Sequence, residues 1–221
     1  LFLTGLWAQT NPQDAESLRD DPLFEIANHS LEHKAFRPCY TLPVLRNEEK
    51  VAAVSESEQV IKQITGKRPY YFRFPGGSIE CARQRDVALV AALGEQPVDW
   101  TAAGDAYQPD PQAVVDSVMA NIRPGAIVAL HMHGSEQTPN APATDEAIAL
   151  LIPELRSQGY ELVTLGQLLG HAEQDVGVGQ EGMQAHSGRS LPGRAVIHSA
   201  AVARSTRGSA VISSLNTPTG C

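Results

Sequence analysis

Short apolar runs alternate with amphipathic stretches along most of the chain, from residue 1 to about residue 169. The apolar runs are bounded by Gly, Pro, Asn or Asp, a pattern that is typical of β-strands. They predict strands at residues 1–5, 23–28, 68–74, 97–102, 125–131 and 160–165.

Between these runs, apolar residues recur at the spacing of an α-helix. Asn11 and Asp110, each followed by a proline, are helix-start signals, Asn47 is expected to cap the next helix, and Gly66 is a stop signal. The pattern predicts helices at residues 11–20, 47–66, 85–94, 110–122, 144–159 and 166–170.

Repeated strand–helix units predict a parallel α/β domain over residues 1–170. A G-x-G-x-x-G sequence follows none of the predicted strands, so a dinucleotide-binding fold has no supporting motif. A complete or partial (β/α) barrel is therefore favoured. Residues 171–221 contain many Gly, Ser and Arg without sustained periodicity, which indicates a linker-like tail to which we assign no function.

Composition narrows the classes of partner. The formal net charge of -8 argues against nucleic acid or an anionic membrane surface as the main partner. No apolar stretch is long enough to cross a membrane, and we expect a monomer. Three cysteines are too few for a disulfide framework, although a Cys39–Cys81 bridge would suit an exported protein.

The segment FEIANHSLEHK, residues 24–34, holds the first candidate for chemistry. His29 and His33 follow a predicted strand and are four positions apart, so both imidazoles can face one point. One atom that binds two neutral imidazoles is a divalent metal ion. The alternative is a pair of surface histidines at the end of a strand.

A polar residue of catalytic type lies at or near the end of the apolar part of four predicted strands, namely LFEIAN, PYYFR, PVDW and GAIVALH. These residues are His29, Arg73, Asp99 and His131. In a barrel of parallel strands the carboxyl ends form one mouth, so these four side chains are expected to face one cavity. Each also has a structural alternative: Arg73 could cap a carboxylate at the sheet rim, and Asp99 could cap a loop. Trp100 could belong to the core, and His133 is predicted to lie outside the site.

The motifs NHSLEH, FRFPGG, VDWTAAGDAY and IVALH, in this order, resemble the polysaccharide deacetylase domain of carbohydrate esterase family 4. The resemblance covers residues 1–169. It implies an irregular or partial (β/α) barrel of the deacetylase type, here lacking its first strand.

The resemblance also implies roles for these residues. His29 and His33 would be two ligands of a divalent ion, either zinc or another such as cobalt. Arg73 would orient the catalytic base, and His131 would be the general acid, with a carboxylate such as Asp99 tuning it. The expected substrate-binding residues are Pro75, Gly76, Trp100 and Leu130. Gly76 and Gly77 are expected to leave room for a ligand near the backbone.

Three departures from the family pattern affect these expectations. The first motif, a strand ending in two aspartates that supply the base and the third metal ligand, would precede Leu1. The third motif has no tyrosine, and the fourth fits either Asp99–Trp100 or Asp105–Tyr107 imperfectly. We therefore expect the chain to be N-terminally truncated and, taken alone, impaired.

The sequence thus predicts a metal-dependent hydrolase that removes N- or O-acetyl groups from an acetylated glycan. Family habit implies an extracellular or cell-envelope location. One alternative is a catalytically inactive carbohydrate-binding module with Trp100, Tyr107 and Tyr71 as stacking surfaces. Another is a metal-dependent barrel hydrolase that acts on a small amide.

Overall fold

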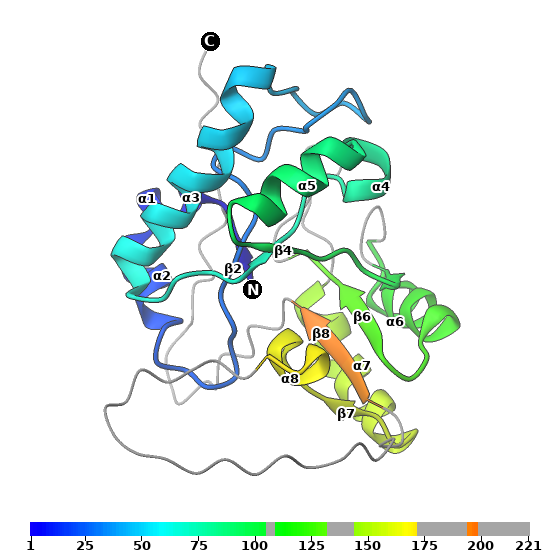
Figure 1. Cartoon of the computed structure of the whole chain (residues 1–221). Helices are drawn as coiled ribbons and strands as arrows, with labels where there is room; N and C mark the ends of the chain where they lie inside the picture. The colour runs from blue at the N-terminus through cyan, green and yellow to red at the C-terminus, as the bar shows by residue number, and fades with distance from the viewer. Residues whose placement is uncertain (105–108, 132–143, 172–193, 199–221) are drawn as a thin grey trace. The chain divides into compact units, whose positions relative to one another are not determined.

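The computed structural model describes residues 1–104, 109–131, 144–171 and 194–198. These residues form two compact units, one within Leu1–Trp100 and one within Thr101–Ala200 (Figure 1). Both units combine parallel strands with helices, which confirms the predicted α/β class. Within the described ranges, no helix is long and apolar enough to span a membrane.

The first unit contains a four-stranded parallel sheet in the order β1-β2-β3-β4. Its strands are β1 (Phe2–Leu3), β2 (Ala27–Asn28), β3 (Tyr71–Phe72) and β4 (Gln96–Pro97). Its helices are α1 (Gly5–Thr10), α2 (Pro12–Ser17), the 3-10 turn η1 (Asn47–Glu49), α3 (Lys50–Thr65), α4 (Ser78–Cys81) and α5 (Gln84–Ala92).

The second unit contains a parallel sheet in the order β5-β6-β8-β7. Its elements are β5 (Ala102–Ala103), α6 (Pro111–Asn121), β6 (Ala126–Ala129), α7 (Thr144–Ser157), β7 (Glu161–Leu162), α8 (Leu165–Leu169) and β8 (Arg194–His198). Strand β8 lies between β6 and β7 (Figure 1), although the sequence predicts no regular structure in that segment. The boundary at residue 170 stays a prediction.

Capping residues explain where several of the helices begin or end. The Asp110 carboxylate accepts from Gln112 N at 3.1 Å, and Gly66 ends α3 with a φ of 72°, as predicted. The prediction that Asn47 caps the helix is wrong. The chain enters η1 through Arg46, whose backbone N donates to the Glu49 carboxylate at 2.7 Å. Helix α1 was not predicted, and the Thr4 hydroxyl caps it.

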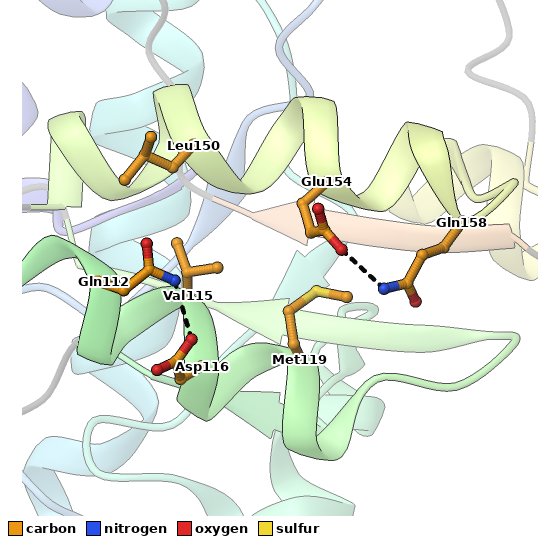
Figure 2. A pocket seen from close by; sticks show the side chains of 7 residues that line it. All are labelled: Gln112, Val115, Asp116, Met119, Leu150, Glu154 and Gln158. Carbon is orange, nitrogen blue, oxygen red and sulfur yellow. Dashed lines mark hydrogen bonds between the residues drawn. The ribbon is translucent and has the colours of Figure 1, made fainter.

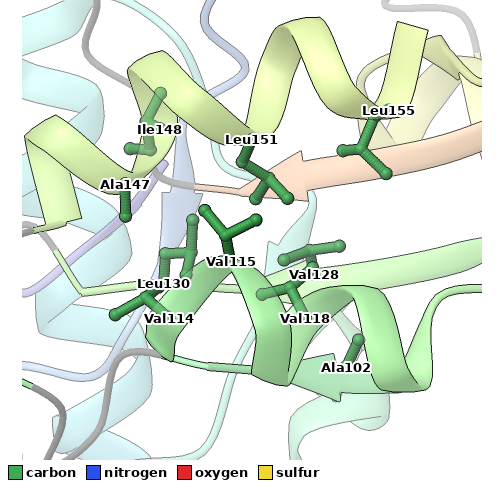
Figure 3. Packing of buried hydrophobic residues seen from close by; sticks show 10 residues of the cluster. All are labelled: Ala102, Val114, Val115, Val118, Val128, Leu130, Ala147, Ile148, Leu151 and Leu155. Carbon is green, nitrogen blue, oxygen red and sulfur yellow. The ribbon is translucent and has the colours of Figure 1, made fainter. Parts of the chain in front are cut away.

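In each unit an apolar core packs between the helices and the sheet. In the first unit, Phe36, Phe72 and Phe74 pack edge to face beneath α3 and α5, with ring centroids 4.8 to 6.0 Å apart. In the second unit, residues of α6 and α7 interdigitate over the sheet (Figure 3). In the first unit, polar residues follow the carboxyl ends of β2 and β3.

Cys39 and Cys81 form a disulfide, with their Cα atoms 5.2 Å apart. The bridge fastens the loop after residue 36 to α4. Arg37 strengthens the attachment, since its guanidinium donates to Glu80 O and Ile79 O, both at 2.8 Å. The disulfide, which is only a possibility from the sequence, is therefore part of the fold.

Replacing both Cys39 and Cys81 by Ala is expected to lower the free energy of unfolding by about 4 kcal/mol. The reason is that the bridge joins residues 42 positions apart and restricts the unfolded chain. Urea unfolding checks this, with Cys221→Ala as the control that keeps the bridge. A double variant as stable as the wild type would show that the bridge does not constrain the unfolded chain.

Candidate active site

The His29 imidazole is fixed at the carboxyl end of β2. Its backbone N donates to Leu3 O at 2.8 Å, and its Nδ1 lies 2.8 Å from Arg73 O. A carbonyl oxygen only accepts, so Nδ1 carries the proton in this bond. The lone pair is then on Nε2, which is the tautomer that binds a metal through Nε2.

His33 lies beside this ring. The two imidazole centroids are 4.9 Å apart, with an interplanar angle of 66°. The turn between them passes through left-handed backbone at Ser30, with a φ of 68°, and His33 itself has a φ of 58°. The structure therefore brings the two predicted ligands together.

The turn is held by Asn28, a residue for which the sequence predicts no role. Asn28 is fully buried, and its Oδ1 accepts from Ser30 N at 3.0 Å. Its Nδ2 donates to Val54 O at 3.1 Å and to Glu95 Oε1 at 2.9 Å. The Ser30 carbonyl accepts from Gly5 N and from the Ser57 hydroxyl, both at 3.0 Å.

Glu95 is the second residue that sequence reasoning missed. Its side chain is 2% exposed, and burial raises its pKa to about 8. The amide of Asn28 and the charge of Arg68 act against this rise, while Glu58 adds to it. The carboxyl group therefore carries its proton at neutral pH.

Arg73 follows β3 and is 6% exposed. Its Nε and Nη2 donate to Val98 O and Asp99 O, both at 3.3 Å, and its guanidinium lies 4.1 Å from the Phe2 ring centroid. Burial lowers its pKa to about 10, and Asp99 acts against this, so Arg73 stays charged at neutral pH. The carboxylate-capping alternative gains no support, since these bonds go to carbonyl oxygens.

Asp99 has a local partner. Its carboxylate accepts from Ser78 N, at 3.0 Å through Oδ1, and also from the Ser78 hydroxyl. These bonds hold the first turn of α4, so Asp99 caps a loop, which was the structural alternative from the sequence. Its predicted role in tuning His131 stays a prediction.

Asp99→Ala is expected to lower the free energy of unfolding by about 1–2 kcal/mol, because α4 loses its capping acceptor. Ser78→Ala should cost less, because the backbone N–H of residue 78 keeps its bond. Urea unfolding of the two variants checks the order. A larger loss in Ser78→Ala would contradict the capping role.

Neighbouring side chains occupy the space on the Cβ side of both glycines in the FPGG motif, and the approach of a ligand to their backbone stays a prediction. A Cβ on Gly76 would lie 2.3 Å from Cys81 Sγ, and one on Gly77 would lie 2.9 Å from Trp100 Cη2. Both glycines have positive φ, 75° and 88°. Their small size thus lets the disulfide and Trp100 approach, while Pro75 beside them is buried.

Trp100 is 37% exposed, and its ring lies 5.5 Å from the Arg73 guanidinium. It remains a candidate for stacking on a sugar. Tyr71 is 1% exposed, so its predicted role as a stacking surface is wrong. Asp105, Tyr107 and His133 lie outside the described residues.

In the second unit, His131 follows the carboxyl end of β6 and is exposed. Leu130 before it is 3% exposed and packs with Val114 and Ile148 in the core (Figure 3). A contact between Leu130 and an acetyl methyl group stays a prediction.

A hollow of about 360 Å³ lies elsewhere, between α6 and α7 (Figure 2). Its polar side chains pair with side chains four positions away in the same stretch of chain. Gln112 donates to Asp116 and Gln158 donates to Glu154, each at 2.9 Å. None of its lining residues is among the predicted site residues.

The two imidazoles are chemically suited to be two ligands of one divalent ion, and this role stays a prediction. Among the described residues, no group of three or more His, Cys, Asp or Glu could hold a metal. A third ligand would have to come from elsewhere. The first unit is thus an α/β scaffold with two metal-ligand-type histidines and a buried arginine at its strand ends.

Residues 1–96 match the family model of polysaccharide deacetylases. The chain is 32% identical to the chitooligosaccharide deacetylase of Bradyrhizobium sp. over 76% of each protein. It is 29% identical to the peptidoglycan-N-acetylglucosamine deacetylase of Bacillus cereus, over 76% of this chain and 73% of that one. This chain belongs to the polysaccharide deacetylase family.

Solved structures agree with this fold. A pseudoenzyme of carbohydrate esterase family 4 from Bacillus anthracis matches with a TM-score of 0.61 and 26% identity. The match covers 77% of this chain but only 54% of that chain. A family 4 acetyl xylan esterase from Clostridium thermocellum, in complex with a cobalt ion, matches with a TM-score of 0.62 and 22% identity, covering 76% of this chain and 75% of that one.

Proposed function

We propose that the protein is a divalent-metal-dependent hydrolase that removes acetyl groups from an acetylated glycan. The observation that carries this proposal is the pairing of His29 with His33, with the proton of His29 held on Nδ1 by Arg73 O. Two neutral imidazoles that lie next to each other are a common basis for zinc or cobalt binding. The cobalt complex of the acetyl xylan esterase supports the same choice of metal.

The chemistry assigns a task to each residue. A divalent ion held by His29 and His33 would polarise the acetyl carbonyl and lower the pKa of water to roughly 7. Arg73 would keep a nearby carboxylate base ionised through its buried positive charge. His131 would donate a proton to the departing amine or alkoxide.

For the substrate we propose an N-acetylated glycan, because both curated relatives carry amide deacetylase names. Trp100, exposed beside Arg73, offers an aromatic face for a sugar ring, and Pro75 and Gly76 would form the adjoining wall. We place the protein outside the cell or in its envelope. The Cys39–Cys81 bridge supports this location, because disulfides persist in oxidising compartments.

We further propose that the 221-residue chain is impaired on its own. The resemblance assigns the catalytic base and the third ligand to an aspartate pair at the end of a strand. The lack of a three-ligand cluster in the described part of the chain supports this. Acetate release from N-acetylated chitooligosaccharides, with added zinc or cobalt, tests it. Turnover that is fast and lost in His29→Ala would support the metal hydrolase but refute the impairment.

A second candidate is a carbohydrate-binding module without catalysis that uses the same residues at the strand ends. It is favoured by the incomplete metal cluster and by the likeness to a pseudoenzyme. Sugar binding that survives both chelation and His131→Ala would support this candidate. Binding that needs the metal would favour the hydrolase.

A further inference from the structure

Glu95 is a buried acid that the proposed chemistry does not use. It lies between α5 and β4, and its Oε1 accepts the hydrogen bond from Asn28 Nδ2. We propose that Glu95 is a positioning residue, which holds the turn carrying His29 and His33 through the amide of Asn28. This inference rests on the proposed function, in which these histidines bind the metal.

The hydrogen bonds of Asn28 allow only one orientation of its amide. Both Nδ2 hydrogens are used, one by Val54 O and one by Glu95 Oε1, while Oδ1 accepts from Ser30 N. A flipped amide would turn its NH₂ group toward the Ser30 N–H, so two donors would face each other. The acceptor on Glu95 therefore helps to fix which side of the amide meets Ser30.

Two further hydrogen bonds link the backbone of Asn28 to the His29 ring. Asn28 O accepts from Arg73 N at 2.9 Å, and Arg73 O in turn accepts from His29 Nδ1 at 2.8 Å. A shift of Asn28 would therefore move both the start of the turn and the carbonyl that orients the imidazole. Ligand orientation by such outer partners commonly changes metal affinity 10- to 100-fold.

Packing alone does not explain a carboxyl group at this position. Glu95 Oε2 has no hydrogen-bond partner, and burying a polar atom in this way is unfavourable. Arg68 does not compensate for this unpaired oxygen. Its Nε is bonded to Glu58 Oε1 at 2.7 Å and its Nη2 to Leu93 O at 3.2 Å. An apolar side chain would avoid this cost but would not supply the acceptor for Asn28.

Two variants separate the effect of the hydrogen-bond acceptor on Glu95 from the effect of its side-chain packing. Glu95→Gln keeps an Oε1 acceptor, whereas Glu95→Leu fills similar volume without one. The expected result for Glu95→Leu is a zinc affinity reduced about 10- to 100-fold in calorimetric titration, and Ser30 amide exchange at least about 10-fold faster. Glu95→Gln should stay within about threefold of wild type in both. Circular dichroism confirms that each variant is folded.

Equal effects of Gln and Leu, or wild-type zinc affinity and exchange in Glu95→Leu, would overturn the proposal. Amide exchange of Ser30 needs no metal, so it separates this inference from the proposed function. If the wild-type chain binds no zinc at His29, the proposed function fails. In that case the positioning of the turn is still decided by the difference in Ser30 exchange between the Leu and Gln variants.

Discussion

His29→Ala is expected to lower the zinc affinity of the chain by at least about 100-fold and to abolish any zinc-dependent release of acetate. The imidazole is one of two predicted ligands, and its Nδ1–H is already bonded to Arg73 O. The lone pair on Nε2 is thus available to the metal, and the described residues contain no group of three or more His, Cys, Asp or Glu that could hold the ion elsewhere. Calorimetric zinc titration and an acetate assay measure the two effects.

His171→Ala is the matched control, since it removes an exposed histidine that follows α8. It should leave zinc affinity unchanged. His33→Ala should resemble His29→Ala, because the two rings lie 4.9 Å apart and would share one ion. Zinc affinity that is unchanged in His29→Ala and His33→Ala but reduced in His171→Ala would move the metal site away from β2.

Glu95→Gln is expected to remove a large pH dependence of stability. Burial raises the pKa of Glu95 from 4.5 to about 8, so the folded state binds the proton more tightly than the unfolded state. The stabilisation from this proton is fully present below about pH 4.5 and is lost as pH rises to about 8. Over this window the wild type should lose about 5 kcal/mol of unfolding free energy through this group.

Urea unfolding at several pH values between 4.5 and 8.5 measures this slope. Glu95→Gln should show a flatter profile and should exceed the wild type in stability at the alkaline end, because an amide does not ionise. Glu56→Gln on the exposed face of α3 is the control, and it should keep the wild-type slope. Parallel profiles for wild type and Glu95→Gln would mean that Glu95 ionises without cost.

The sequence predicted the parts of the site that depend on local spacing. His29 and His33 come together because the residues between them form a tight turn after β2. Arg73 was found because it directly follows an apolar run. These features depend on few residues, so a pattern along the chain is enough to find them.

The parts that the sequence missed depend on tertiary contacts. Nothing in the local sequence around Glu95 indicates burial, since it follows Gly94 in what reads as a surface turn, and its partner Asn28 is 67 positions away. The predicted strand at 97–102 is interrupted because Asp99 turns to bind Ser78, which separates β4 from β5. Strand β8 is short and lies in a segment rich in Gly, Ser and Arg, and it is defined by its pairing with β6 and β7.

The most direct test of the metal site is zinc titration followed by the ¹⁵N resonances of the histidine side chains. We expect the resonances of His29 Nε2 and of the His33 ring to shift together with the first equivalent of zinc. The Nδ1–H of His29 should remain observable because Arg73 O holds it. If the first zinc moves the resonances of other histidines and leaves His29 and His33 unchanged, the proposed metal site is wrong.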